Sequence, residues 1–481
     1  MDNKIDLYCK ELSEKRITVL GVGISNLPLI NFLHNIGVKH IKAVDKGGNT
    51  ENSYNEMLSK VQGLKEQGII QDFKVGEDYL SEIWENTDII FKTPVVRFDI
   101  PELCEARSRG VWITSEMEEF MNLCPAKMFA VTGSDGKTTT TTLVYKILSE
   151  HYKNSDVKVW VGGNIGQPLF SYIREIKPSD KVVLELSSFQ LMNAKVAPDV
   201  SVITNITPNH LDVHKDYQEY IDAKKEIFKN QTEEGLTVLN ADNEITLSCV
   251  FETPARTSAF SYDNDVTSGV CIENGNIVYK KRGVSDVIVS VESIILPGRH
   301  NVENYMAAIL AVYEDINRDK EAILAVASSF GGVEHRLEFV RELNGVKYYN
   351  SSIDSSPNRT IKALSVFKKK NIVMIAGGKD KKIPYDEIGA PIAEKVKVLI
   401  LTGPTAEKIE KAVNDYFTQK GSESDVKIIH CNTYEEAVLT AKNNACPGDV
   451  VLLSPASTSF DMFKNFEERG NVFKNLVNNL T

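Results

Sequence analysis

The stretch "MFAVTGSDGKTT" at residues 128–139 constrains the fold most. A short apolar run leads directly into a glycine-rich turn, and the start of a helix follows. Gly133 and Gly136 allow backbone N–H groups to approach an anion, and the positive end of the helix lies beside them. A buried strand that feeds a helix in this way is typical of a parallel sheet covered by helices. The sequence therefore predicts an α/β fold with a phosphate-binding turn.

This turn departs from the usual phosphate loop, because Val131 stands where that pattern has its first glycine. Lys137 can still reach the outer phosphates of a nucleotide, and the Thr138 hydroxyl can ligate Mg²⁺. Five threonines open the helix although threonine is a poor helix former. A need for hydroxyl groups near a metal–phosphate centre would explain them. The alternative is an ordinary strand–turn–helix connection.

The alternation of strands and helices continues along the chain in three series. A length of 481 residues suits about three domains. We expect a Rossmann-like domain at residues 1–115, a central phosphate-loop ATPase domain with a parallel sheet at 116–332, and a C-terminal Rossmann-like α/β domain at 333–481. A β-rich stretch inside the second domain contains the turn sequence "ENGN".

Composition excludes several classes of protein. The net charge of -11 argues against a nucleic-acid binder, which normally shows a basic face. Seven cysteines without a Cys-x-x-Cys pair indicate reduced thiols and no zinc site. The N-terminus has no apolar signal core, and no apolar run approaches the length of a membrane span. We expect a soluble, cytoplasmic protein that does not bind membranes.

Three further side chains carry chemistry whose meaning the residues alone leave open. Glu185 ends the apolar run "KVVLELSS", where a buried carboxylate is costly unless it is paired or bound to a metal. His210 lies in "TNITPNHLD", although a single histidine is more often structural than catalytic. Lys224 follows Tyr220 by one helical turn and looks like any helical lysine. Periodicity cannot separate it from the adjacent Lys225.

Together, "TGSDGKTT", "GGNIGQPL", "ELSSFQL", "TNITPNHLD" and the Tyr-x-x-Ala-Lys helix resemble the Mur ligase family. These are ATP-dependent, amide-bond-forming enzymes of peptidoglycan synthesis, and the shortened phosphate loop is the form found in that family. The resemblance implies two Mg²⁺ ions, with His210 helping to hold the second, and a carbamylated Lys224. The carbamate needs a neutral amine, so we expect burial to lower the pKa of this lysine. The metal ligands implied are Thr138, Glu185, His210 and Lys224.

The C-terminal stretch "LLSPASTSFDMFKNFEERGNVF" resembles the members of this family that add D-glutamate. It implies UDP-N-acetylmuramoyl-L-alanine and D-glutamate as small-molecule substrates. The Asp-Asn-Pro-Arg signature of diaminopimelate-adding ligases and the Gly-Lys-Gly-Ser of folylpolyglutamate synthases are absent from the sequence. The alternatives are a Mur-type ligase for another amino acid and a regulatory NTPase. An NAD(P)-dependent oxidoreductase built on "GVGISN" ranks last, since it leaves the phosphate loop unexplained.

The resemblance also assigns residues to each ligand. Those expected around ATP are Gly133, Ser134, Asp135, Gly136, Lys137, Thr138, Thr139, Asn301, Asn304 and Arg336, with His300 and His335 nearby. Those expected around the UDP-sugar are Ile24, Ser25, Asn26, Asp45, Lys46, Thr93 and Asn164. Those expected around D-glutamate are Ser355, Lys381, Ser459, Phe460 and Phe466. The catalytic residues implied are Lys137, His210 and Lys224.

Two positions depart from the pattern of the family. Ile353 falls where well-known members carry a lysine that grips D-glutamate. Ser355 and Ser356 remain as hydrogen-bond donors, and Arg359 is the nearest cation. The stretch "KTPVVRFD" lacks the Pro-Gly that usually follows this strand and helps to bind the sugar substrate.

The implied reaction begins with phosphorylation of the L-alanyl carboxylate, and the D-glutamate amine then attacks the acyl phosphate. Lys137 and two Mg²⁺ ions would neutralise the charge that develops on the transferring phosphoryl group. The third domain would close over the site and exclude water from the acyl phosphate. We expect a monomer.

Overall fold

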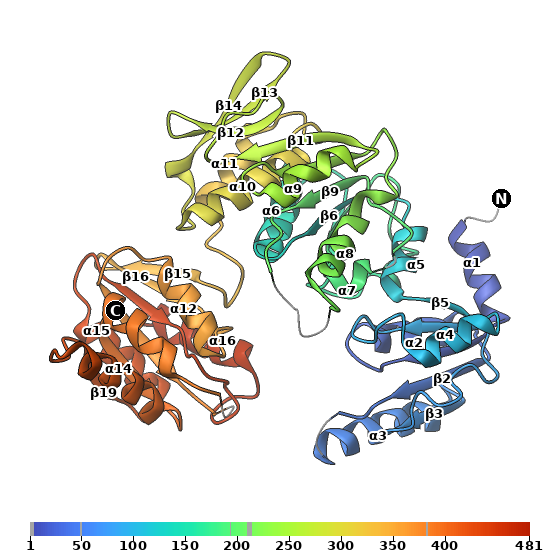
Figure 1. The fold of residues 1–481 in the computed structure, drawn as a ribbon, viewed down its shortest axis with the longest axis horizontal. Helices are drawn as coiled ribbons and strands as arrows, with labels where there is room; N and C mark the ends of the chain where they lie inside the picture. Colours follow the sequence, from blue (N-terminus) through green and yellow to red (C-terminus); the bar gives the residue numbers. More distant parts are fainter. Residues whose placement is uncertain (1–3, 49–50, 193, 209–213, 381–382) are drawn as a thin grey trace. The chain divides into compact units, whose positions relative to one another are not determined.

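The structure is a computed structural model of an α/β protein with three sheets (Figure 1). It describes residues 4–48, 51–192, 194–208, 214–380 and 383–481. The chain forms two compact units. One comprises Met1–Val291 and Val302–Val326, and the other comprises Glu292–Asn301 and Ala327–Thr481. The first two sheets belong to the first unit and the third sheet to the second unit. The predicted α/β class is confirmed, whereas the predicted domain boundaries stay predictions.

The first sheet has five parallel strands in the order β3-β2-β1-β4-β5. Its helices, in chain order, include one before β1 and one after β5. The strands are β1 (Arg16–Leu20), β2 (His40–Asp45), β3 (Asp72–Val75), β4 (Ile89–Lys92) and β5 (Trp112–Thr114). The helices are α1 (Lys4–Ser13), α2 (Asn26–Asn35), α3 (Glu51–Glu66), α4 (Pro101–Ser108) and α5 (Glu116–Leu123).

The central sheet has nine strands in the order β14-β13-β12-β11-β10-β9-β6-β8-β7. These are β6 (Lys127–Thr132), β7 (Val159–Gly163), β8 (Lys181–Glu185), β9 (Val200–Ile203), β10 (Leu236–Asn240), β11 (Arg256–Ser261), β12 (Gly269–Glu273), β13 (Asn276–Lys281) and β14 (Val284–Ser290). Strands β6 to β12 pair in parallel. The expected parallel sheet therefore needs one correction. Strand β12 pairs antiparallel with β13 through the turn at Asn274 and Gly275, and β13 pairs antiparallel with β14 through the turn at Arg282 and Gly283.

The α-helices that follow the central strands are α6 (Lys137–His151), α7 (Ser188–Leu191), α8 (Tyr217–Lys229), α9 (Glu244–Ser248), α10 (Arg299–Val312) and α11 (Lys320–Ser329). The short 3-10 helices in this part of the chain are η1 (Phe170–Tyr172), η2 (Cys249–Phe251) and η3 (Val291–Ser293). The first and central sheets share one hydrophobic core. In it, the rings of Phe32 of α2 and Phe170 of η1 pack edge to face, with their centroids 5.0 Å apart. This shared core explains why both sheets belong to the same compact unit.

The third sheet has the order β15-β16-β20-β17-β18-β19, and only its β15–β16 pair is antiparallel. The strands are β15 (Glu338–Leu343), β16 (Val346–Asn350), β17 (Ile372–Gly377), β18 (Val396–Thr402), β19 (Lys427–His430) and β20 (Val450–Leu453). The helices are α12 (Pro357–Ser365), η4 (Asp386–Ile388), α13 (Gly389–Lys395), α14 (Ala406–Lys420), α15 (Tyr434–Asn444) and α16 (Phe466–Asn478). Buried apolar residues pack on both faces of this sheet, as a covered parallel sheet requires.

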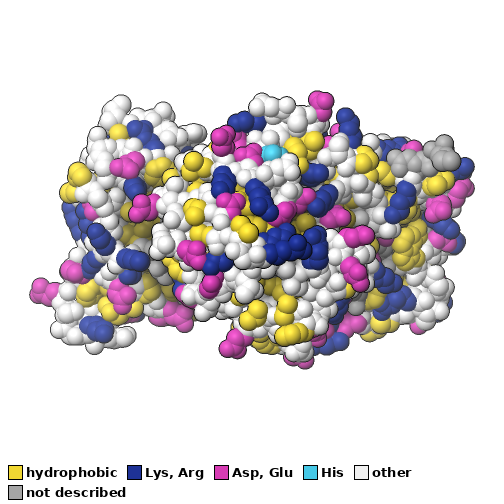
Figure 2. Space-filling view, turned by 90° about the horizontal axis from the view of Figure 1, so that it is seen from above, with side chains coloured by type: hydrophobic (Ala, Val, Ile, Leu, Met, Phe, Trp, Pro, Cys, Tyr) yellow, Lys and Arg dark blue, Asp and Glu magenta, His cyan; other side chains and the backbone are white. Residues whose placement is uncertain are grey.

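Two surface properties bear on the expected partners. Acidic and basic side chains are interspersed over much of the face drawn in Figure 2, so the described residues there form no extended surface of one charge sign. Within the described part of the chain, every helix is too short or too polar to cross a bilayer.

Candidate functional site

The predicted phosphate loop is a tight turn between β6 and α6, and its two glycines cannot be replaced without collision. Gly133 has φ +150°, and a Cβ there would lie 1.9 Å from Thr204 Oγ1. Gly136 has φ +80°, and a Cβ there would lie 2.3 Å from Asn304 Oδ1. Neighbouring side chains therefore lie so close to the turn that only glycine, which has no Cβ, fits at these two positions. The first backbone N–H groups of α6 lie at this turn, as an anion site requires.

Residues after β9 hold this loop in shape. Thr204 Oγ1 donates to the Asp135 carbonyl at 2.6 Å. Asn205 bonds the same residue twice, accepting from Asp135 N at 3.0 Å and donating to Asp135 O at 3.1 Å. Sequence reasoning missed the role of Thr204 and Asn205. Their signal was the polar pair that directly follows a buried strand next to β6.

Two lysines converge on one carbonyl oxygen of the loop. Lys137 Nζ donates to Gly133 O at 2.9 Å, and Lys224 Nζ donates to the same atom at 2.7 Å. Lys224 is only 1% exposed. Burial, and then the nearby charge of Lys137, lower the pKa of Lys224 to about 6, while Asp135 and Glu185 act in the opposite direction. A buried amine with this pKa is largely neutral at pH 7 and can act as a nucleophile.

The structure separates the two adjacent lysines of α8. Lys225 Nζ pairs with Glu252 Oε1 at 2.6 Å, whereas Lys224 Nζ lies over the ring of Tyr220, 4.6 Å from its centroid. The Tyr220 hydroxyl shares a hydrogen bond of 3.0 Å with Ser134 Oγ. Successive helical residues point about 100° apart, so only one of the two lysines can face the loop. Lys224 is the one that does.

Glu185 has the chemistry of a cation ligand. It ends β8, which pairs with β6, and its side chain is 1% exposed. Its Oε1 accepts a hydrogen bond from Asn164 Nδ2 at 2.8 Å, while Oε2 has no hydrogen-bond partner among the described residues. A buried carboxylate oxygen in this condition is costly, and a hard cation would satisfy it. Glu185 and Thr138, which lies in the first turn of α6, therefore fit Mg²⁺.

The remaining residues expected around ATP lie in both compact units. Ser134, Asp135, Thr139 and Asn304 belong to the first unit, where Asn304 Oδ1 accepts from Thr140 Oγ1 at 3.2 Å. Asn301 and Arg336 belong to the second unit. His210 lies outside the described residues.

The expected UDP-sugar site centres on the turn between β1 and α2. Both carboxylate oxygens of Asp45 accept hydrogen bonds from backbone groups in this region. Oδ2 accepts from Val22 N at 2.7 Å, and Oδ1 accepts from Gly47 N at 2.8 Å. Asn26 is buried and donates to Leu20 O and Gly21 O. The exposed residues at the same edge of the sheet are Ile24, which is 86% exposed, and Lys46. Thr93 follows the neighbouring strand β4, whereas Asn164 lies beside Glu185 in the central sheet.

In the second unit, buried Arg469 ties together the loops that carry the residues expected around D-glutamate. Its guanidinium donates to Ser352 O at 2.8 Å and to Ser457 O at 3.0 Å. Ser352 Oγ in turn donates to Phe466 O at 2.8 Å. The expected ligands in these loops are Ser355, Ser459, which is 2% exposed, and Phe460, which is 60% exposed, while Phe466 is the first residue of α16. Lys381 lies outside the described residues. Sequence reasoning missed Arg469, which carried no signal beyond its place in the C-terminal stretch.

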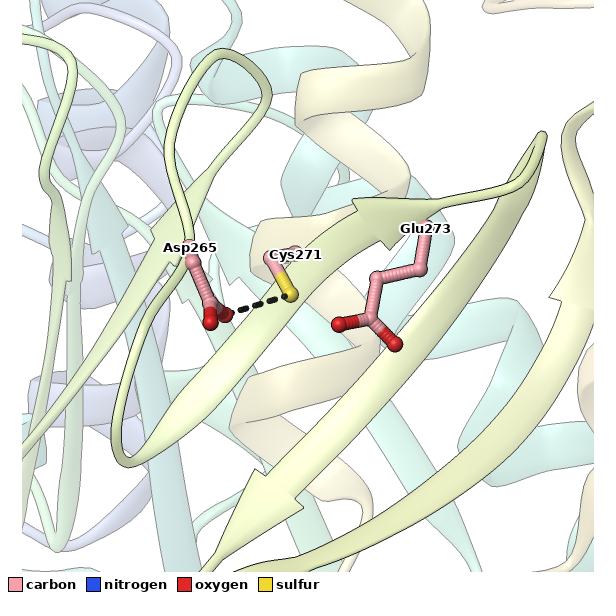
Figure 3. Close-up of side chains that lie close together, drawn as sticks. All are labelled: Asp265, Cys271 and Glu273. Atoms are coloured by element: carbon pink, nitrogen blue, oxygen red, sulfur yellow. Dashed lines mark hydrogen bonds between the residues drawn. The ribbon is translucent and has the colours of Figure 1, made fainter.

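One cluster elsewhere has the residue types of a metal site. Asp265, Cys271 and Glu273 approach one another around β12 (Figure 3). Lys280 of β13 already pairs with both carboxylates, at 2.6 Å to Asp265 Oδ1. The ammonium group supplies the positive charge that a metal would bring, so this cluster is an ion-pair network.

A cavity of about 770 Å³ lies at the opposite edge of the central sheet, where β6, β9, β10 and β11 begin. Its lining includes Lys127, Asp199, Leu236, Arg256 and Asp315. None of the described residues expected to bind a substrate lines it. In open α/β sheets, ligands bind at the carboxyl ends of the strands, which places the candidate site at the other edge.

Comparison with known proteins identifies the family. The Mur ligase middle domain matches residues 131–312, and the Mur ligase, glutamate ligase domain matches residues 335–457. Proteins named UDP-N-acetylmuramoylalanine--D-glutamate ligase from Ruminiclostridium cellulolyticum and Acetivibrio thermocellus are 55% and 49% identical to this chain over 480 residues. Each alignment covers 100% of both chains.

Solved structures show the same fold at low sequence identity. A UDP-N-acetylmuramate-alanine ligase from Thermotoga maritima superposes with a TM-score of 0.53 and 18% identity, covering 97% of this chain and 99% of that one. MurF from Acinetobacter baumannii superposes with a TM-score of 0.54 and 16% identity, covering 76% of this chain and 82% of that one. Full-length identity near one half, two matching family domains and a shared fold agree. This chain belongs to the Mur ligase family and is an ATP-dependent, amide-bond-forming ligase.

Proposed function

We propose that this chain adds D-glutamate to UDP-N-acetylmuramoyl-L-alanine with consumption of ATP, in the cytoplasmic synthesis of peptidoglycan precursors. The names of full-length relatives at 47–55% identity support this choice of substrates. The convergence of Lys137 and Lys224 on Gly133 O, beside a buried Glu185 oxygen without a described partner, is the structural observation that carries it. That arrangement suits a metal-assisted phosphoryl transfer.

The reaction has two chemical steps. Transfer of the γ-phosphoryl group to the L-alanyl carboxylate gives an acyl phosphate, which supplies a leaving group that a free carboxylate lacks. The D-glutamate amine then attacks the acyl carbon, an amide bond forms, phosphate leaves, and the amine gives up a proton. Lys137 would neutralise charge on the transferring group, and the N–H groups from Gly136 to Thr139 would hold the nucleotide phosphates.

The chain's own residues would hold two Mg²⁺ ions. Thr138 and Glu185 would bind the ion beside the nucleotide, whereas His210 and a carbamylated Lys224 would bind the ion beside the acyl acceptor. When bound, the ions supply positive charge that stabilises the phosphoryl oxygens. The pKa of about 6 supports the carbamate, because carbamylation needs the neutral amine that burial favours. The pairing of Lys225 with Glu252 supports Lys224 as the modified residue.

The substrate contacts follow the three sheets. Ile24, Ser25, Asn26, Asp45, Lys46, Thr93 and Asn164 would bind the UDP-sugar. Asn301, Asn304 and Arg336 would complete the ATP site, and Ser355, Lys381, Ser459, Phe460 and Phe466 would meet D-glutamate. We assign these roles to domains at residues 1–115, 116–332 and 333–481, and we propose that the chain acts as a monomer.

Phosphate release from ATP tests this function. We expect release to require both UDP-N-acetylmuramoyl-L-alanine and D-glutamate, and to fall at least about 100-fold with L-glutamate, D-aspartate or L-lysine. Equal hydrolysis without the sugar substrate would indicate a regulatory NTPase. Faster turnover with another amino acid would identify a Mur-type ligase of different specificity.

A further inference from the structure

The segment that follows β4 of the first sheet is tied to the first turn of α8 by a compact group of charges. The Arg97 guanidinium donates from Nη1 and Nη2 to the two carboxylate oxygens of Glu219, at 2.9 and 2.8 Å. It also donates from Nε and Nη2 to the two oxygens of Asp99, at 2.8 and 3.0 Å. Arginine is suited to this role, because its planar fork matches a carboxylate in a fixed orientation.

Lys215, just before α8, completes the group. Its Nζ lies 2.6 Å from Asp99 Oδ2, and its backbone N–H donates to Glu219 Oε2 at 2.8 Å. Two positive and two negative side chains thus alternate across the junction between the first sheet and α8. The side chains of Arg97 and Glu219 are 22% and 23% exposed, so water screens their attraction only in part. Hydrogen bonding from Arg97 lowers the pKa of Glu219 to about 2, so this carboxylate stays charged at neutral pH.

On its inner side, Glu219 adjoins a buried histidine. His214 is 3% exposed, and its Nδ1 lies 3.4 Å from Glu219 Oε2. Its Nε2 shares a hydrogen bond of 2.9 Å with Ser188 Oγ at the start of α7, and its ring stacks on Phe189. The same ring packs edge to face with the ring of Tyr220, with the two ring centroids 5.2 Å apart. The charge group therefore continues into packed side chains beside the phosphate loop.

The contacts then reach the loop itself. Tyr220 follows Glu219 in α8, and its hydroxyl bonds Ser134 Oγ. Lys224, one turn further along, bonds Gly133 O. A displacement of the first turn of α8 would therefore move these two contacts between α8 and the phosphate loop.

At its other end, the Arg97 segment borders the expected sugar site. It begins at Thr93, whose Cγ2 approaches Gly21 so closely that a Cβ there would be 2.7 Å away. Gly21 opens the turn between β1 and α2, at the carboxyl edge of the first sheet where open α/β sheets bind their ligands. A ligand on that edge would rest against the segment that Arg97 anchors.

We propose that Arg97 is a positioning residue that couples binding of the UDP-sugar to the alignment of α8 with the phosphate loop. The inference rests on the proposed function for the identity of the ligand. Sugar binding fixes the 93–100 segment, Arg97 fixes Glu219, and α8 then holds Tyr220 and Lys224 against the loop. Arg97 itself acts through Glu219 and touches no reacting atom.

The test measures affinity for the ATP analogue AMP-PNP with Mg²⁺, alone and with saturating UDP-N-acetylmuramoyl-L-alanine. In the wild-type chain we expect the sugar substrate to tighten AMP-PNP binding about tenfold. Arg97→Met should lose most of this factor and lower kcat about 10- to 100-fold, while AMP-PNP affinity without the sugar changes less than about twofold. Arg97→Lys should retain an intermediate factor, since it keeps the charge and loses the fork.

Arg16→Met is the matched control. Arg16 makes an equivalent paired contact with Asp88, at 2.6 and 3.0 Å, but at the amino edge of the same sheet. The Arg16→Met variant should show the same tightening of AMP-PNP binding by the sugar substrate as the wild-type chain. Should Arg97→Met fold poorly, Glu219→Gln removes the same ion pair at constant size and should show the same loss.

Three outcomes would overturn the inference. They are wild-type coupling in both Arg97→Met and Glu219→Gln, no coupling in the unmodified chain, and equal loss of coupling in the Arg16 control. Failure of the unmodified chain to bind the sugar substrate would overturn the proposed function as well. An active enzyme with normal coupling in the variants overturns only the role of Arg97.

Discussion

The turn between β1 and α2 and the phosphate loop between β6 and α6 use the same backbone plan with different charges. Each follows a buried parallel strand, contains two glycines and opens a helix. In the first turn, the Asp45 carboxylate accepts from Val22 N and Gly47 N. In the second, Lys137 and Lys224 donate to Gly133 O, and neutral side chains from the end of β9 hold the loop.

The two turns share a backbone plan but differ in the side chains around them: a carboxylate at the end of β2 borders the first, whereas lysines of α6 and α8 border the second. A carboxylate that occupies backbone N–H groups repels phosphate, so the first turn is less suited to a triphosphate. The ammonium group of Lys137, beside the first backbone N–H groups of α6, favours one. The four predictions below test this contrast, from the largest expected effect to the smallest.

Lys137→Ala should reduce kcat by at least about 1000-fold, because it removes the charge that stabilises the transferring phosphoryl group. Phosphate release at saturating ATP and sugar substrate measures the loss. Lys146→Ala, an exposed lysine of the same helix, should stay near wild type. Near-normal turnover by folded Lys137→Ala would remove the basis for calling the second turn a phosphate site.

Lys224→Ala should reduce kcat by about 100-fold or more, and acetate should restore part of the activity by filling the vacated position of the carbamate oxygens. Lys225→Ala is the control and should be mild, since Lys225 pairs with Glu252 instead of the loop. Greater sensitivity at Lys225 than at Lys224 would show that the wrong lysine was chosen. Wild-type activity in both Lys224→Ala and Lys225→Ala would rule out the carbamate hypothesis for this chain.

Asp45→Ala should raise the KM for the UDP-sugar about tenfold and leave the KM for ATP unchanged, because it loosens only the first turn. Steady-state kinetics with each substrate varied in turn separates the two effects. Asp72→Ala, on the edge strand β3 of the same sheet, serves as the control. A raised KM for ATP together with an unchanged KM for the UDP-sugar would reverse the assignment of the two turns.

The lysine pKa also predicts a pH dependence of stability. Because the pKa of Lys224 falls to about 6 on folding, the unfolded chain binds more protons between pH 6 and the ordinary lysine pKa. The contribution of Lys224 to the free energy of unfolding therefore rises with pH across this window, by at most about 1.4 kcal/mol per pH unit. Thermal midpoints in carbonate-free buffer should climb more steeply from pH 6.5 to 9 for the unmodified chain than for Lys224→Met. Parallel curves would mean that the buried amine stays protonated.

Much of the fold could be predicted because it depends on local pattern. The apolar run before Gly133 indicated a buried strand, and the "ENGN" sequence marked the β12–β13 turn. That turn also joins two antiparallel strands, which is why the central sheet is not parallel throughout. The phosphate loop was predictable for the same reason, since its glycines and Lys137 are contiguous in sequence.

The parts that sequence reasoning left open depend on distant partners. Lys224 and Lys225 look alike in sequence, and Gly133 and Glu252 separate them only in three dimensions. The Arg97–Glu219 pair joins residues 122 positions apart, so neither side chain stands out from other surface charges. Asn205 and Thr204 acquire their role because β9 lies next to β6.

The antiparallel ribbon at the end of the central sheet also bears on how the chain behaves at high concentration. An open strand edge is a template for pairing with another copy, and β14 is such an edge with Val284 and Val287 exposed on it. The register between β13 and β14 shifts at Ile277 and Val278, which bends the outer strand. Such an irregular edge pairs less readily with a second copy, so we expect it to oppose edge-to-edge aggregation at the end of the sheet remote from β6 and β8.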